Sequence, residues 1–249
     1  MNLWVQRLLG RVVSLREDET TVALLMFAYS FLAMTAHNIL KPVTGSSFID
    51  HLGADNQPWV QLVVGLFIGV LMHWYTNVVR KLPRQRVIPI TLLGIVALLV
   101  AFWALMQTGA VWVTVALYSL GLLLGVFLIS QFWTLANEIY DARQAKRLFG
   151  FIGGGASLGG AVGATLLRVL VFQVGSTNML LVSAAVLGVC VVIVDAILRR
   201  QPTTPSDGFV EEQGVGGREA IRLLAESDHL KIMALVIGCA AAGAAIVQQ

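Results

Sequence analysis

Charged residues are scarce in this chain of 249 residues, where 12% are Asp, Glu, Lys or Arg and 57% are hydrophobic. Ordinary soluble domains carry about 25% charged and roughly 45–50% apolar residues. A soluble globule needs a charged surface, and 17 basic plus 14 acidic residues cannot supply one here. Disordered chains combine high charge with low hydrophobicity, so the same composition excludes that class. The sequence therefore predicts a protein whose solvent is the lipid bilayer.

Cysteine is also rare, and patterns of catalytic residues are absent from the sequence. Cys190 and Cys239 both lie in apolar runs, without a Cys or His at metal-ligand spacing. The sequence has no G-x-x-x-x-G-K-S/T phosphate loop, no nucleophile beside a base and no metal-binding pair of His within a helix. The net charge of +3 comes from short loops beside apolar runs, which does not indicate nucleic acid as a partner. We expect no enzyme, no cofactor and no metal.

Seven apolar runs are long enough, or nearly long enough, to cross a bilayer as helices, which takes about 20 residues. They are residues 20–40, 60–79, 87–106, 112–139, 148–174, 177–198 and 232–247. Because period-two alternation is absent, a transmembrane barrel is not indicated. We expect the prolines to lie in loops or at run ends, with Pro42 after the first run and Pro89 in the first turn of the third.

These runs predict the organisation of the chain. Residues 1–19 form a cytoplasmic amphipathic segment, 20–198 a six-helix transmembrane bundle, and 199–230 a cytoplasmic linker rich in Pro, Gly and Ser. Residues 231–249 form a seventh helix that reaches the last residues without a charged or aromatic anchor. We therefore expect a truncated second bundle, and the missing carboxy-terminal helices as a partner.

The distribution of Lys and Arg predicts the orientation. If the amino terminus is cytoplasmic, fifteen of the seventeen basic residues fall on the inner side, and only Lys41 and Arg168 do not. This predicts that 41–59 lies outside and 80–86 inside. Aromatic residues would then mark the outer interface (Trp59, Trp103 and Trp112) and the inner one (Trp74, Trp133 and Tyr140).

The first run carries polar residues on one helical face. Ser30, Met34, His37 and Lys41 follow one another at offsets of four, three and four. One interpretation is a solute path lined by His37 and Lys41. The other is that Lys41 extends its ammonium to the interface while His37 hydrogen-bonds a neighbouring helix.

Further polar side chains lie in the fourth run, at similar offsets. They are Gln131, Thr134, Asn137, Glu138 and Asp141. Gln131 and Asn137 are candidates for solute binding. For Glu138 and Asp141 we expect structural ion pairing with the basic loop that follows at Arg143, Lys146 and Arg147.

The fifth run is rich in glycine, with Gly155, Gly159 and Gly163 four residues apart. Such rows let helix backbones approach closely, so we predict a packing surface. Arg168, further along, either reaches outward to the interface or meets a solute. In the sixth run, Asp195 and Arg199 are spaced as a helix-end ion pair.

Six spans followed by a cytoplasmic linker resemble the amino-terminal half of a major facilitator superfamily transporter. Several motifs resemble the ATP/ADP translocase-like branch: Phe132-Trp133, Ala136-Asn137, Ala145-Lys146-Arg147, the glycine row from Gly153, and Ile39-Leu40-Lys41-Pro42. Nucleotide exchangers of that branch carry a further basic residue where this chain has Thr44-Gly45. They also carry an acidic residue in the fourth helix, where this chain has none from Trp112 to Asn137.

The resemblance implies an all-α, polytopic membrane helix bundle, namely the six-helix amino-terminal half of a major facilitator fold plus one further helix. It implies a secondary transporter that works by alternating access, as a multi-pass protein of the bacterial inner membrane. Because the embedded and outer-facing ionisable groups are mostly basic, we expect an anionic solute, and the resemblance implies a nucleotide-like one. The candidate solute-binding residues are Lys41, His37, Arg168, Gln131 and Asn137. The alternative is a membrane scaffold that keeps the fold but does not transport.

Overall fold

The structure, a computed structural model, describes residues 17–65 and 84–200, and this part of the chain is all-α. The helices are α2 (Glu17–Leu52), the 3-10 turn η1 (Ala54–Asn56), a helix over 57–65, α4 (Arg84–Met106), α5 (Val111–Ile139), α6 (Ala142–Val174) and α7 (Met179–Arg200). Five of them are long and apolar enough to cross a membrane. The chain is therefore a multi-pass helical membrane protein. The expectations for 1–16, for most of the second run and for 201–249 lie outside the described residues.

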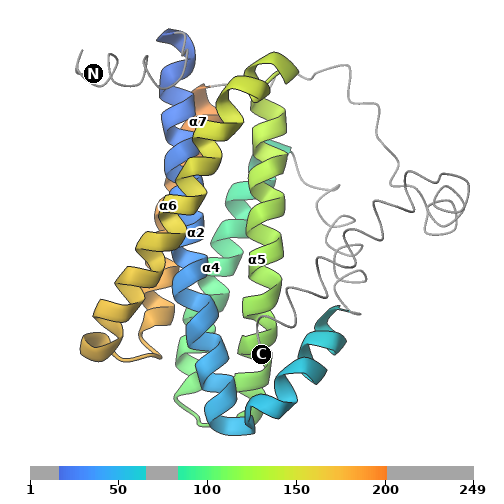
Figure 1. The fold of residues 1–249 in the computed structure, drawn as a ribbon, viewed down its shortest axis with the longest axis vertical. Helices are drawn as coiled ribbons and strands as arrows, with labels where there is room; N and C mark the ends of the chain where they lie inside the picture. The colour runs from blue at the N-terminus through green and yellow to red at the C-terminus, as the bar shows by residue number, and fades with distance from the viewer. Residues whose placement is uncertain (1–16, 66–83, 201–249) are drawn as a thin grey trace, which may run out of the picture. The chain divides into compact units, whose positions relative to one another are not determined.

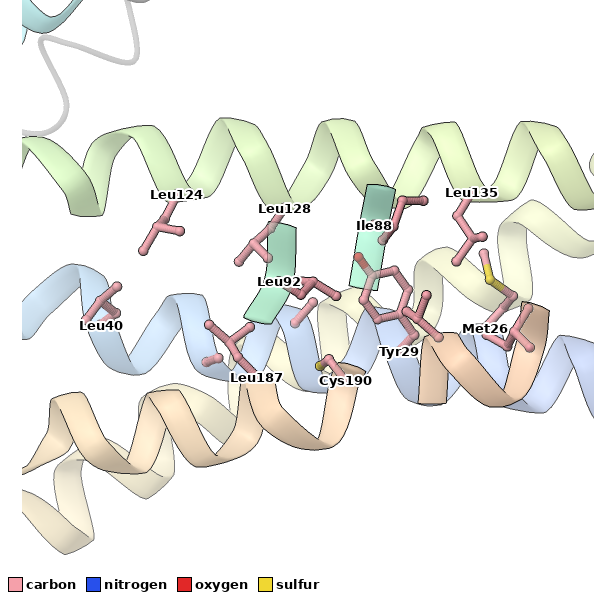
Figure 2. Close-up of a cluster of buried hydrophobic side chains, with 14 of the residues drawn as sticks. Met26, Tyr29, Leu40, Ile88, Leu92, Leu124, Leu128, Leu135, Leu187 and Cys190 are labelled. Atoms are coloured by element: carbon pink, nitrogen blue, oxygen red, sulfur yellow. The ribbon is translucent and has the colours of Figure 1, made fainter. Parts of the chain in front are cut away.

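Helix α2 lies at the centre of the described helices. It packs against α5, α6 and α7, while α4 packs against α5 and α7 (Figure 1). Figure 2 shows the buried side chains that fill the space between them, which come from α2 (Met26, Tyr29, Leu40), α4 (Ile88, Leu92), α5 (Leu124, Leu128, Leu135) and α7 (Leu187, Cys190). A helix surrounded in this way needs apolar or small residues on nearly every side.

The glycine row of α6 contacts α2, as the sequence predicts. A Cβ placed at Gly155 would lie 2.7 Å from the carbonyl oxygen of Phe27, and one at Gly159 would collide with the backbone of Phe31. A Cβ at Gly163 would lie 2.6 Å from the carbonyl oxygen of Thr35. Because residue numbers increase in the same direction along both helices, from Gly155 to Gly163 and from Phe27 to Thr35, the two helices run parallel here. We call this set the α2–α6 glycine contact, and it confirms the predicted packing surface.

Two hydroxyl groups of α2 bind across the α2–α6 glycine contact. Ser30 Oγ donates to the carbonyl oxygen of Ile152 at 2.8 Å, and Thr35 Oγ1 donates to that of Gly159 at 3.0 Å. Hydroxyls hydrogen-bonded between helices are a usual means of association in lipid, and each contributes about 0.6–2 kcal/mol. The contact therefore combines close packing with directional bonds.

Two glycines of α5 form a second close contact, with α2, and the sequence analysis did not predict it. A Cβ at Gly121 would lie 2.7 Å from Thr44 Oγ1, and one at Gly125 would lie 2.7 Å from His37 Cε1. We call these four residues the α2–α5 glycine contact. The signal was present as two glycines four residues apart, the same spacing as in the row on α6.

The predicted positions of two prolines were wrong. Pro42 lies inside α2, which continues to Leu52, so most of the predicted outer loop 41–59 is helix. A proline in a helix removes one backbone hydrogen bond and costs about 3 kcal/mol or more. The helix continues because Val43, Thr44 and Phe48 are buried beyond Pro42, and the Phe48 ring lies 4.6 Å from that of Tyr118 on α5.

Pro89 lies in the second turn of α4, because this helix begins at Arg84 rather than at the start of the apolar run. The prediction placed it in the first turn. Hydropathy locates the part of a helix that lies in lipid, whereas the helix itself begins three residues earlier, in the polar stretch Arg84-Gln85-Arg86.

The α2–α6 glycine contact predicts a large effect of one methyl group. We expect Gly159→Ala to lower the free energy of unfolding by about 1–3 kcal/mol, because its Cβ would overlap rigid backbone that can only separate. Gly154→Ala, on the same helix, is the matched control, since nothing lies within 4 Å of its Cβ. Thermal unfolding in detergent measures both. Equal melting temperatures for the two variants would contradict the contact.

Candidate functional site

The polar face predicted on α2 divides between two environments. Ser30 is buried and bound to α6, as described above, whereas Lys41 is exposed. Met34 and His37 lie between these extremes and are partly buried. Ser30 is therefore part of the packing between helices. The part of the polar face from His37 to Lys41 is the part that can meet a solute.

His37 packs its imidazole ring against Gly125 of α5. Its Nδ1 atom is buried and has no hydrogen-bond partner in the described part of the chain. Of the two interpretations of His37, the hydrogen bond to a neighbouring helix is not formed with the described helices, because the surface of α5 that the ring meets is a glycine Cα with no free polar group. A polar atom buried in this way costs about 1–3 kcal/mol, so it needs an explanation other than packing.

Lys41 and Arg168 are both exposed, and neither side chain forms a hydrogen bond or ion pair within residues 17–65 and 84–200. Lys41 lies one helical turn beyond His37 on α2. Arg168 lies five residues beyond Gly163 on α6, which places it about 140° around the helix from the face that contacts α2. His37 and Lys41 thus remain neighbours, whereas Arg168 is directed elsewhere.

Gln131 and Asn137 lie in different surroundings on α5. Gln131 is buried, and its Nε2 donates to Thr91 Oγ1 on α4 at 2.6 Å. Thr91 Oγ1 in turn donates to the carbonyl oxygens of Val87 and Ile88. Asn137 is exposed. Gln131 therefore joins α5 to α4, and the structure does not bring the five predicted residues together in one constellation.

The acidic residues near the ends of α5 and α7 take different roles. Asp141 was expected to form an ion pair, but it caps α6 instead: its side chain accepts from the backbone N–H of Gln144, whose Oε1 accepts from the Asp141 N–H at 3.0 Å. A capping box satisfies N–H groups that the helix itself cannot. Asp195 pairs with Arg199 at 2.7 Å, which confirms the predicted helix-end pair. The pairing of Glu138 stays a prediction.

Two side-chain hydrogen bonds join neighbouring segments at one end of the bundle, the end where the α4–α5 turn lies. Trp103 Nε1 donates to Asn178 Oδ1 at 2.8 Å, and Gln61 Nε2 donates to the Tyr118 hydroxyl at 2.8 Å. The end of α2, which follows Lys41, also lies here, whereas the α5–α6 turn and the end of α7 lie at the opposite end (Figure 1). Those two segments carry Arg143, Lys146, Arg199 and Arg200. Nothing in the spacing of these four partners predicted either bond.

Among the described residues, no group of three or more His, Cys, Asp or Glu side chains could hold a metal ion. No family model, no curated protein and no solved structure matches the chain. The resemblance to ATP/ADP translocases therefore rests on the sequence motifs alone.

The bond between Gln131 and Thr91 predicts a cost for removing one hydroxyl. We expect Thr91→Val to lower the free energy of unfolding by about 1 kcal/mol or more, because the buried Gln131 amide loses an acceptor. Thr134→Val is the matched control, since the Thr134 hydroxyl is exposed and donates within its own helix to the Ser130 carbonyl oxygen. Denaturation in detergent compares the two, and a larger loss in the control would contradict a structural link between α4 and α5.

Proposed function

We propose that this chain is the helix bundle of a secondary transporter, working by alternating access against a second bundle, and that its solute is an anion or a nucleotide-like molecule. The observation that carries the proposal is the pair His37 and Lys41 on the central helix. Lys41 is exposed at the end of the apolar part of α2 and has no counter-ion in the described residues. Since an uncompensated charge near the membrane is costly, an anionic solute is the partner that these residues fit.

The acidic groups of the described residues do not meet this need. Asp50 and Asp55 follow Lys41 by nine and fourteen residues, beyond the part of α2 that spans the hydrocarbon. Helix α2 has 36 residues and so extends about 54 Å, against roughly 30 Å of hydrocarbon. The α5–α6 turn and the end of α7, near which Glu138, Asp141 and Asp195 lie in the sequence, are at the end of the bundle opposite to the end of α2 (Figure 1). Within residues 17–65 and 84–200, carboxylates therefore leave the surroundings of Lys41 open to an anion from solution.

The orientation that we propose follows from the basic end of the bundle. The α5–α6 turn and the end of α7 carry Arg143, Lys146, Arg199 and Arg200, a concentration that is typical of a cytoplasmic face. Lys41 would then lie near the opposite face, as an entry point for a solute from outside. The bacterial inner membrane and a cytoplasmic amino terminus belong to this proposal.

A non-transporting membrane scaffold is the second candidate. It is favoured by the separation of Arg168 and Asn137 from His37, and by the use of Gln131 between helices. In that case Lys41 would reach the interface by extending along its stem, and loss of its charge would have little effect. The two functions thus differ in what they predict for one residue.

We expect Lys41→Gln to reduce uptake of the transported anion about tenfold or more, because a hydrogen bond to a charged group contributes roughly 1.5–3 kcal/mol. The measurement is initial uptake of radiolabelled ADP, inorganic phosphate or sulfate by vesicles containing the full-length protein. Arg168→Gln tests the second predicted cation. Arg200→Gln, an exposed cation at the opposite end, is the control and should retain uptake.

Two outcomes of this experiment favour the scaffold. One is uptake of none of the three anions by the wild-type protein. The other is normal uptake in both Lys41→Gln and Arg168→Gln, each eluting as a folded protein in size-exclusion chromatography.

The orientation predicts which side labels a cysteine. In a variant whose Cys190 and Cys239 are replaced by alanine, we expect Ser46→Cys to react with an impermeant maleimide added outside the cell, since Ser46 is exposed beyond Lys41. Lys146→Cys, also exposed, should react only after the membrane is opened. Labelling in the reverse order would show that the topology is inverted.

A further inference from the structure

His37 combines three features that anion binding by Lys41 alone does not use. Its ring packs against Gly125, its Nδ1 is buried without a hydrogen-bond partner among the described residues, and Lys41 follows one turn later. Neutral histidine has one ring nitrogen that donates and one that accepts, whereas the protonated ring donates from both. Protonation of His37 therefore requires an acceptor and a counter-charge that its helix neighbours do not supply.

The other described helices do not supply them to this part of α2. The surfaces packed on α2 are glycine at positions 121 and 125 of α5, glycine at 155, 159 and 163 of α6, and Ser183 of α7, which donates to the Ala36 carbonyl oxygen. Among the described residues, Lys41 on α2 is the charged group that acts electrostatically on His37. The glycines and Ser183 that the other described helices place against α2 carry no carboxylate and no other titratable group.

An anion beside Lys41 would supply both missing elements. Its negative charge would offset the repulsion between the Lys41 ammonium and an imidazolium one turn away. Its oxygen would accept the hydrogen bond from the ring nitrogen once the imidazole turns off Gly125. A proton at His37 and an anion at Lys41 would then each favour the binding of the other by the same factor.

We infer that His37 takes up a proton from water when an anion binds beside Lys41, so that the site carries the anion and the proton together. This inference rests on the proposed transport function. No covalent bond forms or breaks in the step. The proton enters and leaves as a hydrogen ion exchanged with solvent, which makes the coupled process an anion–proton symport.

The test counts the protons bound with each anion. Isothermal titration calorimetry of the full-length protein in two buffers of different ionisation enthalpy gives this number for sulfate, which does not titrate between pH 5 and 8, and for ADP. We expect a count that approaches one for the wild-type protein, and an affinity for sulfate that falls by up to tenfold per pH unit as the pH rises through the range in which histidine titrates.

Variants of two histidines on the same helix provide the comparison. His37→Asn and His37→Gln should bind sulfate with a count near zero and without dependence on pH. The phosphate of ADP exchanges protons itself. For ADP, the result is therefore the difference in proton count between each variant and the wild-type protein. His51→Asn is the control, because the exposed His51 lies on the same helix and its partner in the described part of the chain is the Ser47 carbonyl oxygen, one turn earlier. It should behave as the wild type.

The possible failures are distinct. If Lys41→Gln abolishes binding but the His37 variants keep the wild-type proton count and pH dependence, the anion site stands and the proton coupling is wrong. If the wild-type protein binds neither sulfate nor ADP at any pH from 5 to 8, both proposals are wrong.

Discussion

The near contact of two backbones, α2 against α6, is the constraint on which the rest of the bundle depends. Lipid tails are as apolar as leucine, so apolar side chains alone give membrane helices little reason to associate. Association then requires atoms to approach closely, which Gly155, Gly159 and Gly163 allow, and hydrogen bonds such as those of Ser30 and Thr35. Once α2 is held in this way, α5 and α7 pack around the sides that remain.

The position of the candidate site follows from the two glycine contacts. Phe31 and Thr35 of α2 face α6, whereas Tyr29 and Thr44 face α5, whose Phe132 and Gly121 they meet. At 100° per residue, His37 and Lys41 lie on the sector of α2 between those two sides. His37 is partly buried and Lys41 is exposed, so the described helices leave this sector partly uncovered. The same packing that stabilises the bundle therefore presents its polar face.

The sequence predicted what depends on local composition and missed what depends on a partner helix. The apolar runs, the glycine row and the Asp195–Arg199 pair are features of one segment; the five apolar runs that lie in the described residues, the glycine row and the pair were correct. Continuation of α2 through Pro42 depends on Tyr118, 76 residues away, against which Phe48 packs. The bond from Gln131 to Thr91 likewise joins two helices. For the site, the sequence correctly placed His37 and Lys41 side by side but could not place Gln131, Asn137 or Arg168 relative to them.

The energetic cost of His37 favours a transporter over a scaffold. A buried ring nitrogen without a partner costs about 1–3 kcal/mol, a large share of the roughly 5–15 kcal/mol that stabilises a typical protein. A scaffold would gain from an apolar side chain at this position, because Gly125 offers only a Cα surface to pack against. A transporter must change conformation. A group whose hydrogen bonds are all satisfied in one conformation stabilises that conformation and opposes the change. In the proposed transporter, an anion bound beside Lys41 would complete the site by giving the unsatisfied Nδ1 of His37 a partner in a second conformation.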